Sequence, residues 1–233
     1  MTRITKTVTA FSAFRIWSIA LNAAQRAADE KAADPTAITT DTLTSILLSA
    51  VAFEAFINEL PDQLFAIPLH TGKLLPVEPH DWRDVARTIQ QFETDRLQTT
   101  IKYLEASKKM PGNPLDKGSG LFAEFSMLFD IRNDLMHTKP QVDTFPDRSR
   151  KNQKWLLFCR QKKWTYKVKG EEVPLMGWID EIQTPEMAWW SCRASLKIIL
   201  NFVDRFDGVP EHMGEMKDRM AGWNLHRSDK RLM

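Results

Sequence analysis

The stretch LFAEFSMLFDIRNDLMHTKP, residues 121–140, decides the fold that we expect for this chain. Its apolar residues recur at helical spacing, which predicts an amphipathic helix with one buried stripe. The stripe consists of Leu121, Phe122, Phe125, Leu128, Phe129, Leu135 and Met136. Arg132 falls within this stripe, so its guanidinium group needs a counter-charge or a wet cleft. Lys139 and Pro140 are expected to end the helix.

A second helix, expected at residues 40–60, is the candidate for the centre of the fold. Its side chains are apolar almost all round, which is typical of a helix surrounded by other elements. Glu54 and Asn58 lie one turn apart on one of its faces among apolar residues, so we expect the Glu54 carboxylate to be at least partly buried. Packing of this helix against residues 121–140 would let Glu54 pair with Arg132.

Further helices and loops complete the expected order of elements. The long helix expected at residues 82–107 should carry Ile101 and Leu104 on its apolar side and break near Thr94. The pair Thr184-Pro185 predicts the start of the last helix. The expected helices are 7–31, 82–107, a short one at 155–158, and 187–206, and the expected loops are 61–80 and 108–120. We therefore predict an all-α fold, a bundle of about four to six helices with long loops, and allow a small β-hairpin near 164–178.

The domain organisation and the compartment follow from composition. We expect one domain over residues 1–207, with a basic insertion at about 138–183, and a peripheral C-terminal tail at 208–233. The longest apolar run, residues 46–57, is shorter than the ~20 residues that a membrane-spanning helix needs. Arg15 interrupts the N-terminal apolar segment, which argues against a signal peptide. We expect a cytoplasmic protein with no membrane partner.

The cysteines and histidines do not indicate a metal centre. Cys159 and Cys192 are expected to be small buried residues, and neither has a metal-like spacing to the five histidines. The chain also lacks a P-loop, a Gly-x-Ser-x-Gly elbow and a His-Glu-x-x-His motif. We therefore expect no metal and no cofactor, and find no support for P-loop nucleotide hydrolysis, serine hydrolysis or zinc proteolysis.

Basic residues are concentrated in one segment. Residues 138–170 hold ten basic residues against two acidic ones, a net charge of +8, so the remainder of this +2 chain carries −6. The residues that we assign to RNA binding are Lys139, Arg148, Arg150, Lys151 and Lys154. Interleaved aromatic residues, Trp155, Phe158, Trp164 and Tyr166, would suit base stacking. Such charge runs are also common on ordinary solvated surfaces.

Arg132 and His137 form the most informative motif, an arginine and a histidine with four residues between them. Here the chain resembles the HEPN superfamily (higher eukaryotes and prokaryotes nucleotide-binding), whose signature is Arg, four to six residues, then His. A polar residue such as Asn usually follows the arginine of that signature, and Asn133 occupies this position here. Two other pairs, Arg205–His212 and Arg219–His226, fall within the allowed range with six residues between them, but they cross glycines and lack the polar residue after the arginine.

The resemblance implies an all-helical, metal-independent endoribonuclease that acts as a homodimer with the motif at the interface. It implies Arg132, His137 and Asn133 as catalytic residues that cleave RNA by 2′-hydroxyl attack, and we assign supporting roles to Glu54 and Asp134. It also implies a toxin or antiviral-defence effector, with an antitoxin or regulatory protein as a further partner.

Three alternatives remain open at the level of the sequence. Arg132 would be a structural cation if it only neutralised Glu54 across the core, and His137 would then be a favourable cation at a helix C-terminus. The second alternative is a non-catalytic helical module that binds RNA, nucleotide or a protein partner. An antitoxin-like or scaffolding dimer is the third alternative.

Overall fold

The computed structural model describes residues 12–71, 82–137, 154–165, 178–206, 220–224, 226–227 and 229–232. Its regular elements in these ranges are all helical, which confirms the predicted all-α class. They are α1 (Ser12–Ala33), α2 (Asp41–Thr71), α3 (Trp82–Thr94), α4 (Thr99–Lys109), α5 (Gly120–Met136), α6 (Lys154–Gln161), α7 (Trp178–Glu181), α8 (Pro185–Val203), η2 (Asp204–Phe206, a 3-10 helix) and α10 (Ala221–Asn224). The helices in these ranges outnumber the predicted four to six, partly because α7 and α10 are too short to leave a periodic pattern.

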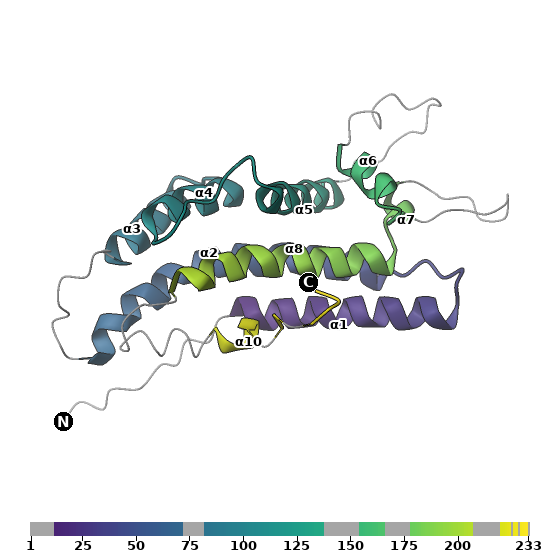
Figure 1. Ribbon diagram of the computed structural model, residues 1–233, viewed down its shortest axis with the longest axis horizontal. Helices are drawn as coiled ribbons and strands as arrows, with labels where there is room; N and C mark the ends of the chain where they lie inside the picture. Colours follow the sequence, from purple (N-terminus) through teal and green to yellow (C-terminus); the bar gives the residue numbers. More distant parts are fainter. Residues whose placement is uncertain are drawn as a thin grey trace.

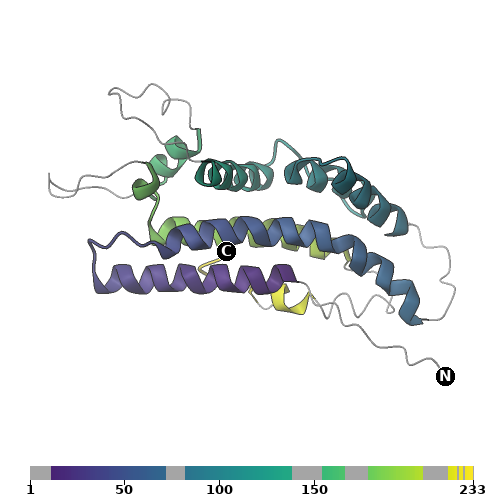
Figure 2. The ribbon, with the colours of Figure 1, turned by 180° about the vertical axis from the view of Figure 1, so that it is seen from behind.

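The long helices form three layers, with α2 and α8 in the middle (Figure 1). α3, α4 and α5 follow one another along one side of this pair, and α1 covers the other side (Figures 1 and 2). The buried face of α1 consists of Ala13, Trp17, Ala20, Ala23, Ala24 and Ala27. Alanine side chains bury apolar surface and leave room for neighbouring helices, so α1 packs along both α2 and α8.

Hydroxyl groups line the contact between α2 and α8. Ser45 Oγ lies 3.1 Å from the carbonyl oxygen of Ala188, and Thr42 Oγ1 lies 3.1 Å from that of Thr184. These hydroxyls donate across the contact, so buried polar groups are satisfied without charge. Cys159 and Cys192 are buried free thiols, as predicted, and burial raises the pKa of Cys159 to about 12.

α2 continues to Thr71, although the sequence predicted a loop over residues 61–80. A proline inside a helix removes one backbone hydrogen bond and commonly bends the helix, and α2 bends toward its C-terminal end (Figure 2). Leu60, Pro61 and Leu64 are buried in this part of the helix, so tertiary packing offsets the lost bond. The loop prediction is wrong for residues 61–71, and residues 72–80 lie outside the described ranges.

The break predicted near Thr94 is confirmed. α3 ends at Thr94 and α4 begins at Thr99. Arg96, between them, has a φ of 53°, a left-handed backbone conformation that cannot continue a right-handed helix. The helix therefore breaks here, and α3 and α4 contact α2 as two separate helices.

An aromatic cluster fixes α4 and α5 above α2 and α8. The Tyr103 ring on α4 is fully buried, with its centroid 5.0 Å from Phe125 on α5 and 4.8 Å from Phe202 on α8. Its hydroxyl donates to the carbonyl oxygen of Phe53 on α2 at 2.7 Å. Tyr103 thus contacts α2, α5 and α8 from α4, and these contacts hold α4 and α5 in place over α2.

Ser119 caps the N-terminus of α5, and its hydroxyl accepts a hydrogen bond from the backbone N–H of Phe122. The buried residues of α5 are Phe122, Phe125, Leu128 and Ile131. Met136, predicted to lie in the buried stripe, is 58% exposed, so that assignment is wrong. Met136 lies about 140° around the helix from Ile131, outside the face that α2 and α8 cover. Arg132 accordingly lies at the edge of the buried face.

The C-terminal segment predicted as a peripheral tail contributes to the core in its described part. Met220, Trp223 and Leu232 are buried, and the Trp223 ring packs edge-on against Phe14 of α1 with centroids 5.4 Å apart. Gly222 lies so close to Phe14 that a Cβ atom would fall 2.5 Å from its ring. Residues 166–177, which hold most of the hairpin allowed above, lie outside the described ranges; Trp178 begins α7.

One window in the described part of the chain, Asp41–Leu64 of α2, has the length and composition of a membrane span, with a mean hydropathy of 1.5. Half of this window is buried inside the fold, and the core helix of a soluble protein passes the same test. The window is therefore only a weak indication of a membrane.

Candidate functional site

Arg132 projects from α5 with 26% of its side chain exposed. Its Nη2 lies 3.5 Å from Oε2 of Glu54 on α2, the ion pair expected from the sequence. Nη1 donates to Oδ1 of Asn133 at 3.0 Å, and the guanidinium lies 5.8 Å from the centroid of Phe129. Among the described residues these hydrogen bonds use two of the five guanidinium N–H groups, so donors remain for an anion.

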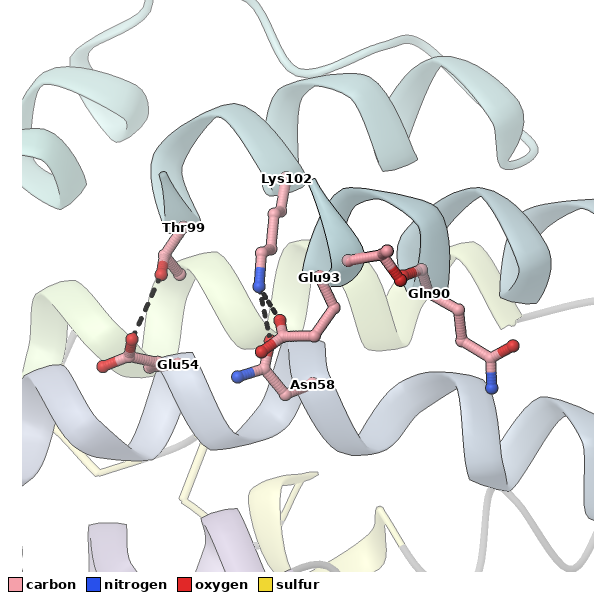
Figure 3. Close-up of polar contacts among 7 residues, drawn as sticks. Glu54, Asn58, Gln90, Glu93, Thr99 and Lys102 are labelled. Atoms are coloured by element: carbon pink, nitrogen blue, oxygen red, sulfur yellow. Dashed lines mark hydrogen bonds and ion pairs between the residues drawn. The ribbon is translucent and has the colours of Figure 1, made fainter. Parts of the chain in front are cut away.

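Glu54 connects α5 to α4. Its second oxygen, Oε1, lies 3.5 Å from the hydroxyl of Thr99, the first residue of α4 (Figure 3). The Glu54 side chain is 34% exposed, which confirms the partial burial that we predicted. Thr99 was not among the candidate residues, because nothing in the local sequence indicates that it faces α2.

Lys102, one turn after Thr99, is a buried cation whose side chain is only 6% exposed. Its Nζ donates to Oδ1 of Asn58 at 3.1 Å and forms an ion pair with Glu93 (Figure 3). Burial lowers the pKa of Lys102, and the negative charge of Glu54 opposes this shift. Lys102 therefore belongs to the same polar cluster as Arg132 and Glu54.

The sequence missed Lys102 because it lies between two apolar positions assigned to the core, Ile101 and Leu104. In the structure Ile101 is 39% exposed and Lys102 takes the inward position. The break after Thr94 rotates α4 relative to α3, so a single helical pattern through residues 82–107 gives the wrong inward face for α4.

A pocket of about 390 Å³ opens beside Lys102, between α2 and α3. Asn58 and Glu93, both bonded to Lys102, form part of its wall, together with Asp62 and Gln90. Two carboxylates in one wall disfavour a phosphate group there. A phosphate would instead meet a partly exposed cation at Arg132.

His137 caps the C-terminus of α5 and is exposed. The two polar residues one turn before His137 are engaged elsewhere: Asn133 accepts from Arg132, and Asp134 Oδ2 accepts from Trp155 Nε1 at 2.7 Å. Within the described part of the chain no side chain forms a hydrogen bond with the imidazole. The structure thus places all five assigned site residues on α2 and α5, but it connects only Arg132, Asn133 and Glu54 to one another.

The described part of the basic segment is docked against the end of α5. Trp155 is buried, bonded to Asp134 and packed edge-on against Trp178 at 5.0 Å. The Trp164 ring lies 5.8 Å from Trp190 of α8. The Trp155 ring therefore serves packing, whereas Trp164 is only partly buried.

The assigned RNA-binding residues are described only in part. Lys154 is exposed at the start of α6, and Arg160 on the same helix forms a 2.8 Å ion pair with Glu181. Lys139, Arg148, Arg150 and Lys151 lie outside the described residues. Of the assigned RNA-binding residues, Lys154 is thus the one that the structure describes, and it is exposed.

The two other Arg–His spacings have structural roles in the parts that are described. Arg205 is buried and donates to the carbonyl oxygens of Pro111 at 3.1 Å and Asn113 at 2.8 Å, so it fastens the loop before α5. His226 packs with its ring 4.9 Å from that of Trp17. Of the three arginine–histidine spacings, the one at Arg132 combines a partly exposed arginine with an exposed histidine.

No group of three or more His, Cys, Asp or Glu side chains in the described ranges could hold a metal ion. Comparison with protein-family models, with curated proteins and with solved structures finds no match to this chain. The site is therefore interpreted from its own geometry: a guanidinium anchored by a carboxylate, with an imidazole at the end of the same helix.

Proposed function

We propose that this chain is a metal-independent endoribonuclease of the HEPN type that acts in the cytoplasm. The observation that carries the proposal is the state of Arg132, which Glu54 and Asn133 anchor while 26% of its side chain stays exposed. An anchored arginine with free donors is suited to hold a phosphate in a fixed orientation. His137, exposed at the end of the same helix, supplies an imidazole, the side chain that most often transfers protons in catalysis.

In the proposed reaction His137 accepts the proton of a ribose 2′-hydroxyl while the 2′-oxygen attacks the adjacent phosphorus. The bond between phosphorus and the 5′-oxygen breaks, and the 5′-oxygen takes up a proton. The products are a 2′,3′-cyclic phosphate and a 5′-hydroxyl end. Arg132 stabilises the negative charge that builds on the non-bridging oxygens, and Asn133 keeps the guanidinium in place.

A homodimer completes the proposed site. Five residues along an ideal helix correspond to about 140° of rotation, so Arg132 and His137 of one α5 point in different directions. A second copy, related by a two-fold axis, would bring a second His137 to the shared interface, one imidazole acting as base and the other as acid. A toxin or antiviral-defence role, with an antitoxin or regulatory partner, belongs to the same proposal.

The test is an RNA cleavage assay in the presence of EDTA. Wild-type protein is expected to cleave, and Arg132→Ala and His137→Ala are each expected to lose at least about 100-fold in rate. Arg26→Ala, which removes an exposed arginine paired with Asp41, is the matched control and should cleave like wild type. Intact RNA with wild type under several conditions, or undiminished cleavage by both variants, would refute the enzyme. A strictly monomeric mass at micromolar concentration would refute the two-fold site.

The second candidate is a non-catalytic helical module that binds RNA, nucleotide or a protein partner. One observation favours it: Asn133 and Asp134 are both engaged away from His137, so the described chain leaves the imidazole without an orienting group. RNA binding that depends on Arg132 but occurs without cleavage would favour this candidate over the enzyme.

A further inference from the structure

Two residues of α4 face two residues of α2 in matching order. Thr99 and Lys102 are one turn apart on α4, and they contact Glu54 and Asn58, one turn apart on α2 (Figure 3). The four side chains form two adjacent polar rungs between the helices. The first rung includes Glu54, whose other oxygen, Oε2, forms the ion pair with Arg132.

The second rung contains a buried charge that stability alone does not require. The Lys102 side chain is 6% exposed, and its ion-pair partner Glu93 is 58% exposed. Taking an ammonium group out of water has a cost, and an apolar side chain of similar length often packs there without loss of stability. Lys102 therefore has a role that its packing does not explain.

That role concerns Glu54, which lies one turn before Asn58 on α2 and therefore beside the rung that Lys102 forms (Figure 3). The Thr99 hydroxyl lies 3.5 Å from Oε1, and Nη2 of Arg132 lies 3.5 Å from Oε2, so each carboxylate oxygen of Glu54 contacts a different helix. Lys102 lies on the next turn of α4, and its ammonium donates to Asn58, one turn from Glu54 on α2, so a positive charge lies near the carboxylate (Figure 3). With either α4 residue removed, Glu54 would have fewer constraints and Arg132 would lose its fixed counter-charge.

We propose that Thr99 and Lys102 are positioning residues of the Arg132 site: together they hold the Glu54 carboxylate, and Glu54 in turn orients the Arg132 guanidinium toward an RNA phosphate. This inference rests on the proposed ribonuclease function. It adds α4 to a site that the sequence confined to α2 and α5.

The test compares Lys102→Met and Thr99→Val with the conservative Thr99→Ser. Lys109→Met removes an exposed lysine of the same helix, paired with Asp84 at 3.3 Å, and is the matched control. Lys102→Met and Thr99→Val are expected to lower the single-turnover cleavage rate about tenfold, as misplacement of a catalytic group does, without lowering Tm. Thr99→Ser and Lys109→Met should cleave at the wild-type rate.

Two further measurements identify the route through Glu54. In a Glu54→Gln background, Lys102→Met should cause no additional loss of rate, because the group through which it acts is already altered. The Nε–Hε NMR resonance of Arg132, assigned by its loss in Arg132→Lys, should shift in Lys102→Met and stay in place in Lys109→Met. This resonance reports the position of Arg132 without any need for cleavage.

The outcomes separate this inference from the proposed function. An unchanged Arg132 resonance in Lys102→Met overturns the positioning role, whether or not RNA is cleaved. A shifted resonance with no loss of cleavage rate, or a full tenfold loss in the Glu54→Gln background, also overturns it. A shifted Arg132 resonance in Lys102→Met, together with a wild-type protein that never cleaves RNA, refutes only the ribonuclease and supports the positioning of Arg132.

Discussion

Glu54 and Arg132 form an ion pair across 3.5 Å although 78 residues separate them in the sequence. The pair joins the central helix α2 to α5, and Thr99 extends it to α4. Both charged groups are partly exposed, so the pair matters more for the orientation of the guanidinium than for the stability of the fold.

The first prediction follows from this partial exposure. Glu54→Gln should change the free energy of unfolding by less than about 1 kcal/mol, because water screens the lost charge. The same variant should lower RNA cleavage about tenfold, because the guanidinium loses its fixed partner. Urea unfolding and single-turnover cleavage check the two halves. A large loss of stability with unchanged cleavage would mean that the pair is structural.

Stability should depend on pH through Lys102. Burial lowers the pKa of the folded-state ammonium below the ordinary value of 10.5, so the unfolded chain binds more protons between the two values. The charged lysine therefore costs stability at pH 7, and this cost disappears as pH rises toward 10.5. Lys102→Met should accordingly be at least as stable as wild type at pH 7, and this advantage should shrink toward pH 10.

Urea unfolding of both proteins across this pH range measures the difference. Burial raises the pKa values of Cys159 and Cys192, which lowers stability as pH rises through the same range. Both proteins contain these thiols, so the difference between them isolates the lysine. A stability difference that does not change with pH would contradict the assignment.

Trp155→Phe tests how the segment around α6 is held against α5. Phenylalanine keeps an aromatic ring beside Trp178 but cannot donate to Asp134. Because that bond joins a neutral donor to a carboxylate, its loss should lower the free energy of unfolding by about 1 to 2 kcal/mol. Asp134→Asn keeps an acceptor oxygen and should lose less. Equal stability of Trp155→Phe and wild type in thermal unfolding would show that the bond does not contribute.

Gly222→Ala tests whether the C-terminal segment belongs to the core. The added Cβ would fall 2.5 Å from the Phe14 ring, which Trp17 and Trp223 confine, so one of these groups must shift. We expect a loss of about 1 to 3 kcal/mol, seen as a lower Tm. Gly120→Ala, where no atom lies within 4 Å of the added Cβ, is the control and should cost nothing. An unchanged Tm for Gly222→Ala would contradict the packing of this segment.

The sequence by itself determined the features that depend on neighbouring residues. The all-α class, the start of α8 at Thr184 and Pro185, and the break after Thr94 are all local, because caps, prolines and periodicity act within a few residues. The pairing of Glu54 with Arg132 was also predictable, since each residue is a charge on an otherwise apolar helical face and such charges need partners.

Only the tertiary structure decided which face each helix buries and what the charged residues contact. Pro61 stays helical because its neighbours are buried, Met136 is exposed because α2 and α8 do not cover it, and Lys102 points inward because α4 is a separate helix. Burial depends on residues far away in the sequence, and a local pattern does not encode them. The sequence therefore indicated Arg132 and His137, and the fold added α4 to the polar site around Arg132.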